Sequence, residues 1–123
     1  MQFLTAQQII GIHNRVIRPH ERQGRALQKS IESVIARVET RVAYGLIENV
    51  FELAACYAVH ITVAHAFNDA NKRTAFAAMH TVLKLNGIEL TYTAEEAGDM
   101  IRKAAQRRTD EQDVSQWLRM CAQ

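Results

Sequence analysis

The stretch HAFNDANKRT, His65 to Thr74, separates the two strongest helical patterns of the chain. An apolar segment, Leu46 to Ala64, precedes it, and a second helical pattern runs from Arg73 to Asn86, where Gly87 ends it. Most of the remaining chain has apolar residues at helical spacing. The stretch therefore determines how the two helices are joined, and we expect the other helices to pack around this junction.

The same stretch has the features of an anion site. Asp69 or Asn71 is predicted to cap the second helix, because a short side-chain oxygen accepts hydrogen bonds from first-turn amides. Lys72 and Arg73 then fall in the first turn, where the helix dipole disfavours a cation by about 0.3–1 kcal/mol. Free amides and two cations at one helix N-terminus favour a phosphate. His65 lies just upstream, so the sequence predicts a phosphate site with a base beside it.

Signals for helix ends occur along the whole chain. The helix that starts at Thr5 should stop near Ile17, because Arg18 precedes the only proline, Pro19. The polar segment Pro19–Gln28 is predicted to be a loop, and a loop of this length often acts as a lid or binding segment. Thr5 with Gln8, and Thr93 with Glu96, are predicted to form capping boxes at the starts of their helices. Ser30 and Asp110 are predicted to cap two further helices.

Together these signals predict an all-α fold. No strand-type alternation of useful length, repeat or low-complexity tract is present. With 123 residues, of which 48% are apolar, the chain suits one domain with one core. We predict a single compact helical domain, residues 1–123, of about six helices around the apolar segment Leu46–Ala64.

Composition and charge argue against several classes of protein. The 15 basic and 13 acidic residues leave a net charge of +2, which is too balanced to indicate direct binding of nucleic acid. The N-terminus has no basic region followed by an apolar run, so no signal peptide is predicted. The central apolar segment is expected to be buried rather than to span a membrane, because it carries polar residues, namely Glu48, Asn49, Glu52 and His60.

Several other polar residues receive structural interpretations. His60 is interpreted as a hydrogen-bonded core histidine. Cys56 and Cys121 lie inside apolar helical patterns, which favours buried thiols and a cytoplasmic location over a disulfide framework. The densest basic patch is interpreted as a solvated helix face, and it consists of Arg102, Lys103, Arg107 and Arg108.

The motif resembles the signature of the Fic/DOC family, His-x-Phe-x-(Asp/Glu)-(Gly/Ala)-Asn-(Gly/Lys)-Arg. The five matching positions are in register, and they are His65, Phe67, Asp69, Asn71 and Arg73. The resemblance extends to the segment Ala36–Tyr44 and covers most of the chain, with its weakest parts in the loop 19–29 and at the C-terminus. It implies an all-α fold.

Residues next to the signature distinguish the branches of this family. Members that transfer AMP from ATP to a hydroxyl usually have glycine at the positions of Ala70 and Lys72, and an arginine at that of Phe76. The Doc toxins share the departures seen here. The resemblance to them implies a toxin of a type II toxin–antitoxin system that acts as a protein kinase. It implies transfer of the ATP γ-phosphate to a Thr/Ser hydroxyl of elongation factor Tu, which arrests translation.

The resemblance also implies roles for individual residues. His65 is expected to be the general base, because a neutral imidazole near pH 7 can accept the proton of an attacking hydroxyl. Asp69 is expected to hold Mg²⁺, and Lys72 and Arg73 to complete the catalytic set by stabilising charge on the phosphates. The nucleotide-binding residues that it implies are Phe67, Asn68, Asn71, Lys72 and Arg73, with Phe67 acting by packing beneath the loop.

Partners and alternatives follow from the same resemblance. Many family members carry an autoinhibitory motif, Ser/Thr-x-x-x-Glu-(Gly/Asn), which this sequence lacks. We therefore expect a small separate antitoxin as a partner. We expect no direct binding to nucleic acid or to a membrane. Two other functions stay open, which are a protein AMP transferase and a non-catalytic binding protein with the same fold.

Overall fold

The computed structural model describes residues 1–27 and 29–122. Gln28, the end of the predicted loop, and Gln123, the end of the predicted domain, lie outside these residues. The prediction of an all-α fold of about six helices is confirmed, since the described residues contain no strand and only one isolated β-bridge, between Arg25 and Phe67. The helices are α1 (Ala6–Val16), α2 (Ile31–Ala43), α3 (Val50–Ala64), α4 (Asn71–Leu85), α5 (Ala94–Ala105) and α6 (Glu111–Cys121).

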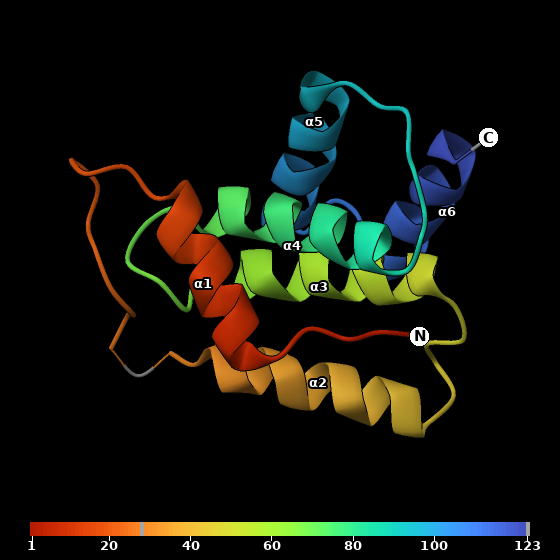
Figure 1. Ribbon diagram of the computed structural model, residues 1–123, viewed down its shortest axis with the longest axis horizontal. Coiled ribbons are helices and arrows are strands. Elements are labelled where there is room, and N and C mark those ends of the chain that lie inside the picture. Colours follow the sequence, from red (N-terminus) through yellow and green to blue (C-terminus); the bar gives the residue numbers. More distant parts are fainter. Residues whose placement is uncertain (28, 123) are drawn as a thin grey trace.

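Helix α3 lies at the centre of the molecule and packs against α2, α4, α5 and α6 (Figure 1). Its six consecutive residues from Leu53 to Ala58 are all buried, as expected for a helix that is apolar all round. The predicted start near Leu46 is wrong, because α3 begins at Val50. The side chain of Asn49 accepts a hydrogen bond from the amide of Glu52 and so caps the helix there.

Most other predicted helix ends are confirmed. Thr5 and Thr93 form complete capping boxes, and the side chains of Ser30 and Asp110 accept from the third residue of their helices. Helix α1 ends at Val16, and the described part of the following segment is not helical. In Figure 1 this α1–α2 loop lies beside the loop that joins α3 to α4.

The N-terminal segment is fixed to the central helix by Tyr57. Its hydroxyl accepts from the amide of Leu4 at 2.9 Å and donates to the carbonyl of Leu4 at 3.2 Å. Tyr57 is 1% exposed, so both groups are satisfied inside the core. This anchor fixes the segment that leads into α1, which also packs against α4.

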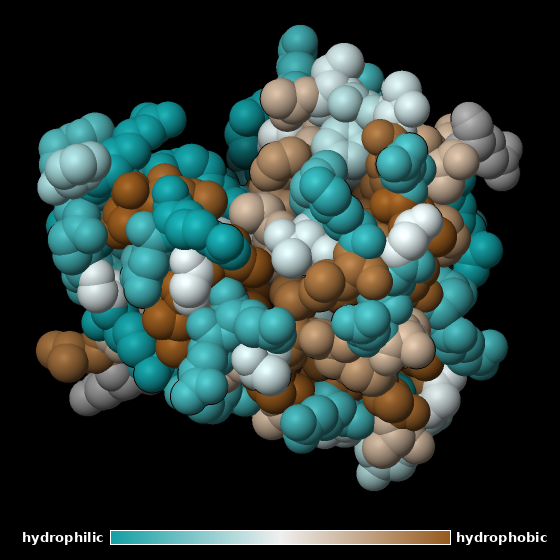
Figure 2. Space-filling model, viewed as in Figure 1, coloured by the Kyte–Doolittle hydropathy of each residue, from teal (hydrophilic) through white to brown (hydrophobic). Residues whose placement is uncertain are grey.

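The surface agrees with most of the remaining predictions. Figure 2 shows hydrophilic residues over the α1–α2 loop, at the left of this face, and apolar residues gathered toward the middle. No helix in the described part of the chain combines the length and apolarity that crossing a membrane requires. Cys56 is buried as predicted, but Cys121 is only half-buried, because it lies in the last turn of α6. The basic patch is exposed throughout, as predicted for Arg102, Lys103, Arg107 and Arg108.

Candidate functional site

His65 is the C-cap of α3, directly after the last helical residue, Ala64. Its backbone is left-handed, with φ 50° and ψ 42°, and its side chain is exposed. Histidine adopts this conformation more readily than most residues other than glycine. The chain therefore leaves the central helix abruptly, and the imidazole stands at the start of the α3–α4 loop.

The loop is held by Asn71, the first residue of α4. The side-chain oxygen of Asn71 accepts from the amide of Phe67 at 3.1 Å, and its nitrogen donates to the carbonyl of Phe67 at 2.9 Å. Both polar atoms of this amide are thus engaged by the loop backbone. In this arrangement Asn71 positions the loop, whereas its predicted contact with phosphate stays a prediction.

Phe67 and His13 form the floor of the loop. Their rings stack with centroids 3.8 Å apart, and both residues are nearly fully buried. The Nε2 atom of His13 also lies 2.9 Å from the carbonyl oxygen of Asp69. The predicted packing of Phe67 beneath the loop is confirmed. The sequence reasoning missed His13, although its place four residues after buried Ile9 signals the inner face of α1.

Asn68 connects the α3–α4 loop to the α1–α2 loop. Its side-chain nitrogen donates to the carbonyl of Gln23 at 2.8 Å, and its amide donates to the carbonyl of Gly24 at 3.0 Å. The amide of Ala26 donates to the carbonyl of Ala66 at 2.9 Å. These bonds place the predicted loop against the motif. The Asn68 side chain joins the two loops, and the nucleotide contact predicted for it stays a prediction.

The N-cap of α4 is Ala70, so the prediction of Asp69 or Asn71 is wrong. Ala70 is left-handed, with φ 66° and ψ 25°, and no side chain in residues 1–27 and 29–122 caps the helix. The reason is competition, because Asn71 bonds to Phe67 and the carboxylate of Asp69 turns toward the α1–α2 loop. Within the described part of the chain, the first-turn amides of α4 therefore have no side-chain acceptor, which leaves them open to an anion.

Asp69 is held by Arg22. Its Oδ2 atom accepts from the Arg22 amide at 3.1 Å and lies 3.7 Å from Nε of the same arginine. Among the described residues, only this oxygen of the carboxylate is hydrogen-bonded. The side chain is 37% exposed, so the carboxylate is accessible to a cation.

Arg73 is paired with an acidic residue of the α1–α2 loop. Its guanidinium donates to the carbonyl of Val16 at 2.6 Å and also to the carboxylate of Glu21. The hydrogen bond from Arg73 is the main cause that holds the pKa of Glu21 below its ordinary value. Lys72, in contrast, is exposed at the same helix end.

One pocket of about 310 Å³ brings together the four predicted catalytic residues, His65, Asp69, Lys72 and Arg73. Glu21 and Thr62 also line it. The Oγ1 atom of Thr62 is buried and has no hydrogen-bond partner among the described residues, so a residue that lines this pocket carries an unsatisfied polar atom. A neighbouring pocket of about 260 Å³ shares Lys72 and Arg73 and has Phe76 and Ile101 in its wall.

These observations fit a site for a phosphorylated ligand and a hard cation. Open amides and Lys72 suit phosphate oxygens, and the free oxygen of Asp69 suits Mg²⁺. The exposed His65 lies in the same pocket as a possible base. The arrangement is therefore compatible with chemistry at a phosphate group.

Comparison with known proteins points to the same family. The model of the Fic/DOC family matches residues 3–83. The "Protein kinase doc" of Escherichia phage P1 is 32% identical over 120 residues, which cover 97% of this chain and 94% of that protein. The "Toxin Doc" of Mycolicibacterium smegmatis is 32% identical over 84 residues, which cover 65% of this chain and 64% of that protein.

Proposed function

Because the chain belongs to the Fic/DOC family, we propose that it is a toxin that transfers the γ-phosphate of ATP to a Ser/Thr hydroxyl of a protein. One observation carries the proposal. The uncapped N-terminus of α4, with Lys72 in its first turn, shares a pocket with His65 and Asp69. Both relatives support it by name, since one is called a protein kinase and the other a toxin.

His65 acts in this proposal as the general base. Its ring is exposed at the pocket, and it takes the proton of the attacking hydroxyl on a ring nitrogen. The left-handed backbone fixes where the imidazole starts, and the Asn71 bridge fixes the loop that follows. Proton removal by a positioned side chain contributes about 10²–10⁴-fold to a rate.

The α4 N-terminus acts as the phosphate cradle. First-turn amides and the Lys72 ammonium stabilise charge on phosphate oxygens, and Arg73 joins them when it leaves Glu21. Asp69 would hold Mg²⁺ through its carboxylate, and the bound ion would neutralise phosphate charge. Lys72 and Ala70 add bulk and charge where AMP-transferring relatives have glycine, which favours an orientation of ATP that presents the γ-phosphate to His65.

The wider biological role belongs to the same proposal. The resemblance to Doc toxins makes elongation factor Tu the proposed substrate, arrested translation the proposed consequence, and the cytoplasm the proposed location. A separate antitoxin is the proposed partner of a type II system, since toxins of this kind are held in check by a second protein. One relative is named a toxin and the other a protein kinase, which supports these two parts of the proposal.

A transfer assay with two labels tests the proposal. Purified protein, Mg²⁺ and a ribosome-depleted bacterial extract are incubated with ATP that is labelled at either the α- or the γ-phosphate. We expect label only from the γ-phosphate, and the labelled band identifies the substrate. His65→Asn is the matched variant, because asparagine tolerates the left-handed backbone but is not a base. It should lose transfer by about 10²-fold or more and relieve the arrest of growth on expression.

Three outcomes contradict the proposal in different ways. Label from the α-phosphate makes the protein an AMP transferase. No label from either position, with His65→Asn still arresting growth, favours a non-catalytic binding protein. Equal transfer by wild type and His65→Asn removes His65 from the chemistry.

A further inference from the structure

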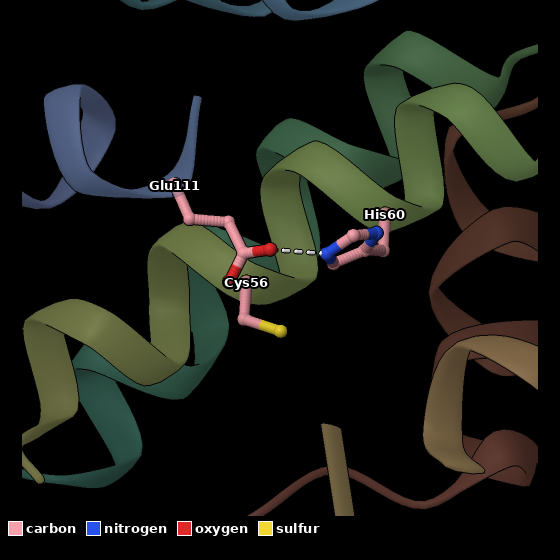
Figure 3. Close-up of side chains that lie close together, drawn as sticks. All are labelled: Cys56, His60 and Glu111. Carbon is pink, nitrogen blue, oxygen red and sulfur yellow. Dashed lines mark hydrogen bonds and ion pairs between the residues drawn. The ribbon is translucent and has the colours of Figure 1, made fainter. Parts of the chain in front are cut away.

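A second group of reactive side chains lies outside the motif pocket, between α3 and α6. Cys56 and His60 are one turn apart on α3, and Glu111 is the first residue of α6 (Figure 3). One potential ligand atom from each residue lies within 4.8 Å of the other two. His60 Nε2 is 2.5 Å from Glu111 Oε1. The proposed transfer reaction uses none of these three residues.

The cluster is buried on one side and accessible on the other. Cys56 is 0% exposed and His60 7% exposed, whereas the Glu111 side chain is 26% exposed. Glu111 also lines a pocket of about 350 Å³ that Ser115 and Gln116 of α6 help to form. An ion or a water molecule can therefore reach the carboxylate from this pocket.

Charged groups of α2 face the cluster. Arg41 donates from Nε to Glu111 Oε2 and pairs through Nη2 with Oε1, both at 2.9 Å. Burial, followed by the charge of Glu111, raises the pKa of the Cys56 thiol to about 12, although Arg41 and Arg37 act in the opposite direction. The thiol thus carries its proton at neutral pH while no cation is bound.

We propose that Cys56, His60 and Glu111 bind a divalent transition metal ion of the Zn²⁺ type. Thiolate, imidazole and carboxylate are the ligands that Zn²⁺ takes in proteins, and a Cys and a His one helical turn apart face the same side. Three protein ligands leave one position of a tetrahedral ion free, and the pocket at Glu111 provides water for it.

Metal binding needs a small rearrangement and the loss of one proton. Bonds of about 2.0–2.3 Å place tetrahedral donor atoms about 3–4 Å apart, so His60 Nε2 and Glu111 Oε1 must separate slightly. Glu111 is partly exposed and is the first residue of α6, so its side chain can make this shift without moving the core. The Cys56 proton leaves to solvent, so the ion is held by a thiolate, an imidazole and a carboxylate, and the Arg41 charge remains beside them. Arg41 stays on Glu111 Oε2 and orients it, as outer partners of metal ligands do.

Such an ion connects α6 to the central helix. The family match ends at residue 83, so Glu111 belongs to the part of the chain beyond it. The site is independent of the transfer reaction, because none of its ligands lines the motif pocket.

Cobalt spectroscopy tests this site directly. The full chain, reduced and stripped of metal with a chelator, is titrated with Co²⁺ alone. We expect one equivalent to produce a thiolate-to-cobalt charge-transfer band with visible d–d bands, and Zn²⁺ to displace it. Cys56→Ser should abolish the charge-transfer band, and His60→Gln should weaken Co²⁺ binding by at least about tenfold. Cys121→Ser is the matched control, since it removes the other thiol and should change nothing.

Thermal stability provides a second measurement that does not depend on the cobalt absorption bands. Zn²⁺ should raise the Tm of wild type and of Cys121→Ser, but not that of Cys56→Ser, whose helical content is checked by circular dichroism. Absence of a Cys56-dependent band overturns the proposal and leaves His60, Glu111 and Arg41 as a hydrogen-bonded network between helices. A band that disappears in Cys121→Ser overturns it as well, because the ion is then bound elsewhere.

Discussion

The guanidinium of Arg73 donates a hydrogen bond to the carboxylate of Glu21, across the pocket that contains His65. The α1–α2 loop thereby places an acidic group on the cation that we propose for phosphate binding. Glu21 is half-buried, and Arg73 is the main cause of its lowered pKa, so the carboxylate is ionised and paired at neutral pH. Phosphate must compete with this carboxylate for Arg73.

We therefore expect Glu21→Gln to bind ATP a few-fold more tightly than wild type. The substitution removes the competing charge and keeps the shape of the side chain. Equilibrium binding of ATP, measured by calorimetry, checks the result. Glu32→Gln is the matched control, because Glu32 pairs with Arg25 outside the pocket and its loss should leave ATP binding unchanged. Weaker binding by Glu21→Gln would show instead that Glu21 positions Arg73 for the nucleotide.

Asn71 and Lys72 are neighbours with separable roles. Asn71→Ala removes both hydrogen bonds to Phe67 and should lower the free energy of unfolding by about 1–3 kcal/mol, because buried backbone groups lose their partners. Lys72→Met removes an exposed charge and should leave stability within about 0.5 kcal/mol. Urea denaturation measures both effects. Lys72→Met is expected to lose more ATP affinity than Asn71→Ala, although it loses less folding stability. If Asn71→Ala lost more ATP affinity and Lys72→Met more stability, these assignments would be contradicted.

The fold was predictable where local signals and tertiary packing agree. The capping boxes at Thr5 and Thr93, and the apolar segment that becomes α3, specify helices without help from distant residues. The start of α3 was harder, since Leu46 continues the apolar pattern although Asn49 provides the cap. A local capping signal here outweighs periodicity.

The site was predictable in its residues but not in its contacts. The motif gave His65, Asp69, Lys72 and Arg73, which do line one pocket. The contacts of His13 and Glu21 come from segments more than 50 residues away in the chain, as the separations of 56 and 52 positions show. Periodicity and capping rules describe neighbours within a few positions, so they cannot place such partners.

Thr62 provides a test of whether the pocket is built for a polar ligand. Its buried hydroxyl has no partner among the described residues, so Thr62→Val should leave stability unchanged or raise it by up to about 1 kcal/mol. The same variant should bind ATP a few-fold more weakly if the hydroxyl serves the ligand. Thr74→Val is the contrast, because the Thr74 hydroxyl donates to the carbonyl of Ala70 at 2.7 Å and its loss should destabilise the protein by about 1 kcal/mol. Unchanged ATP binding by Thr62→Val would remove Thr62 from the site.

Tyr57 makes the stability of the protein sensitive to alkaline pH. Burial raises the pKa of Tyr57 above its ordinary value of 10.0, although the hydrogen bond with Leu4 acts in the opposite direction. The folded state therefore keeps the phenol protonated at pH values where the unfolded chain has lost this proton. The stabilising contribution is fully present below pH 10.0 and is lost as the pH rises through the raised pKa of the folded state.

The loss of stability above pH 10.0 should approach about 1.4 kcal/mol per pH unit for this one group. Urea denaturation at a series of pH values from about 8 to about 11 measures how the free energy of unfolding changes with pH. Tyr57→Phe should be less stable at neutral pH by about 1–3 kcal/mol, because the two Leu4 groups lose their partner, but its alkaline slope should be shallower. Tyr44→Phe, at a 77% exposed position, should keep the wild-type slope. An equal slope in wild type and Tyr57→Phe would mean that the alkaline loss of stability arises elsewhere.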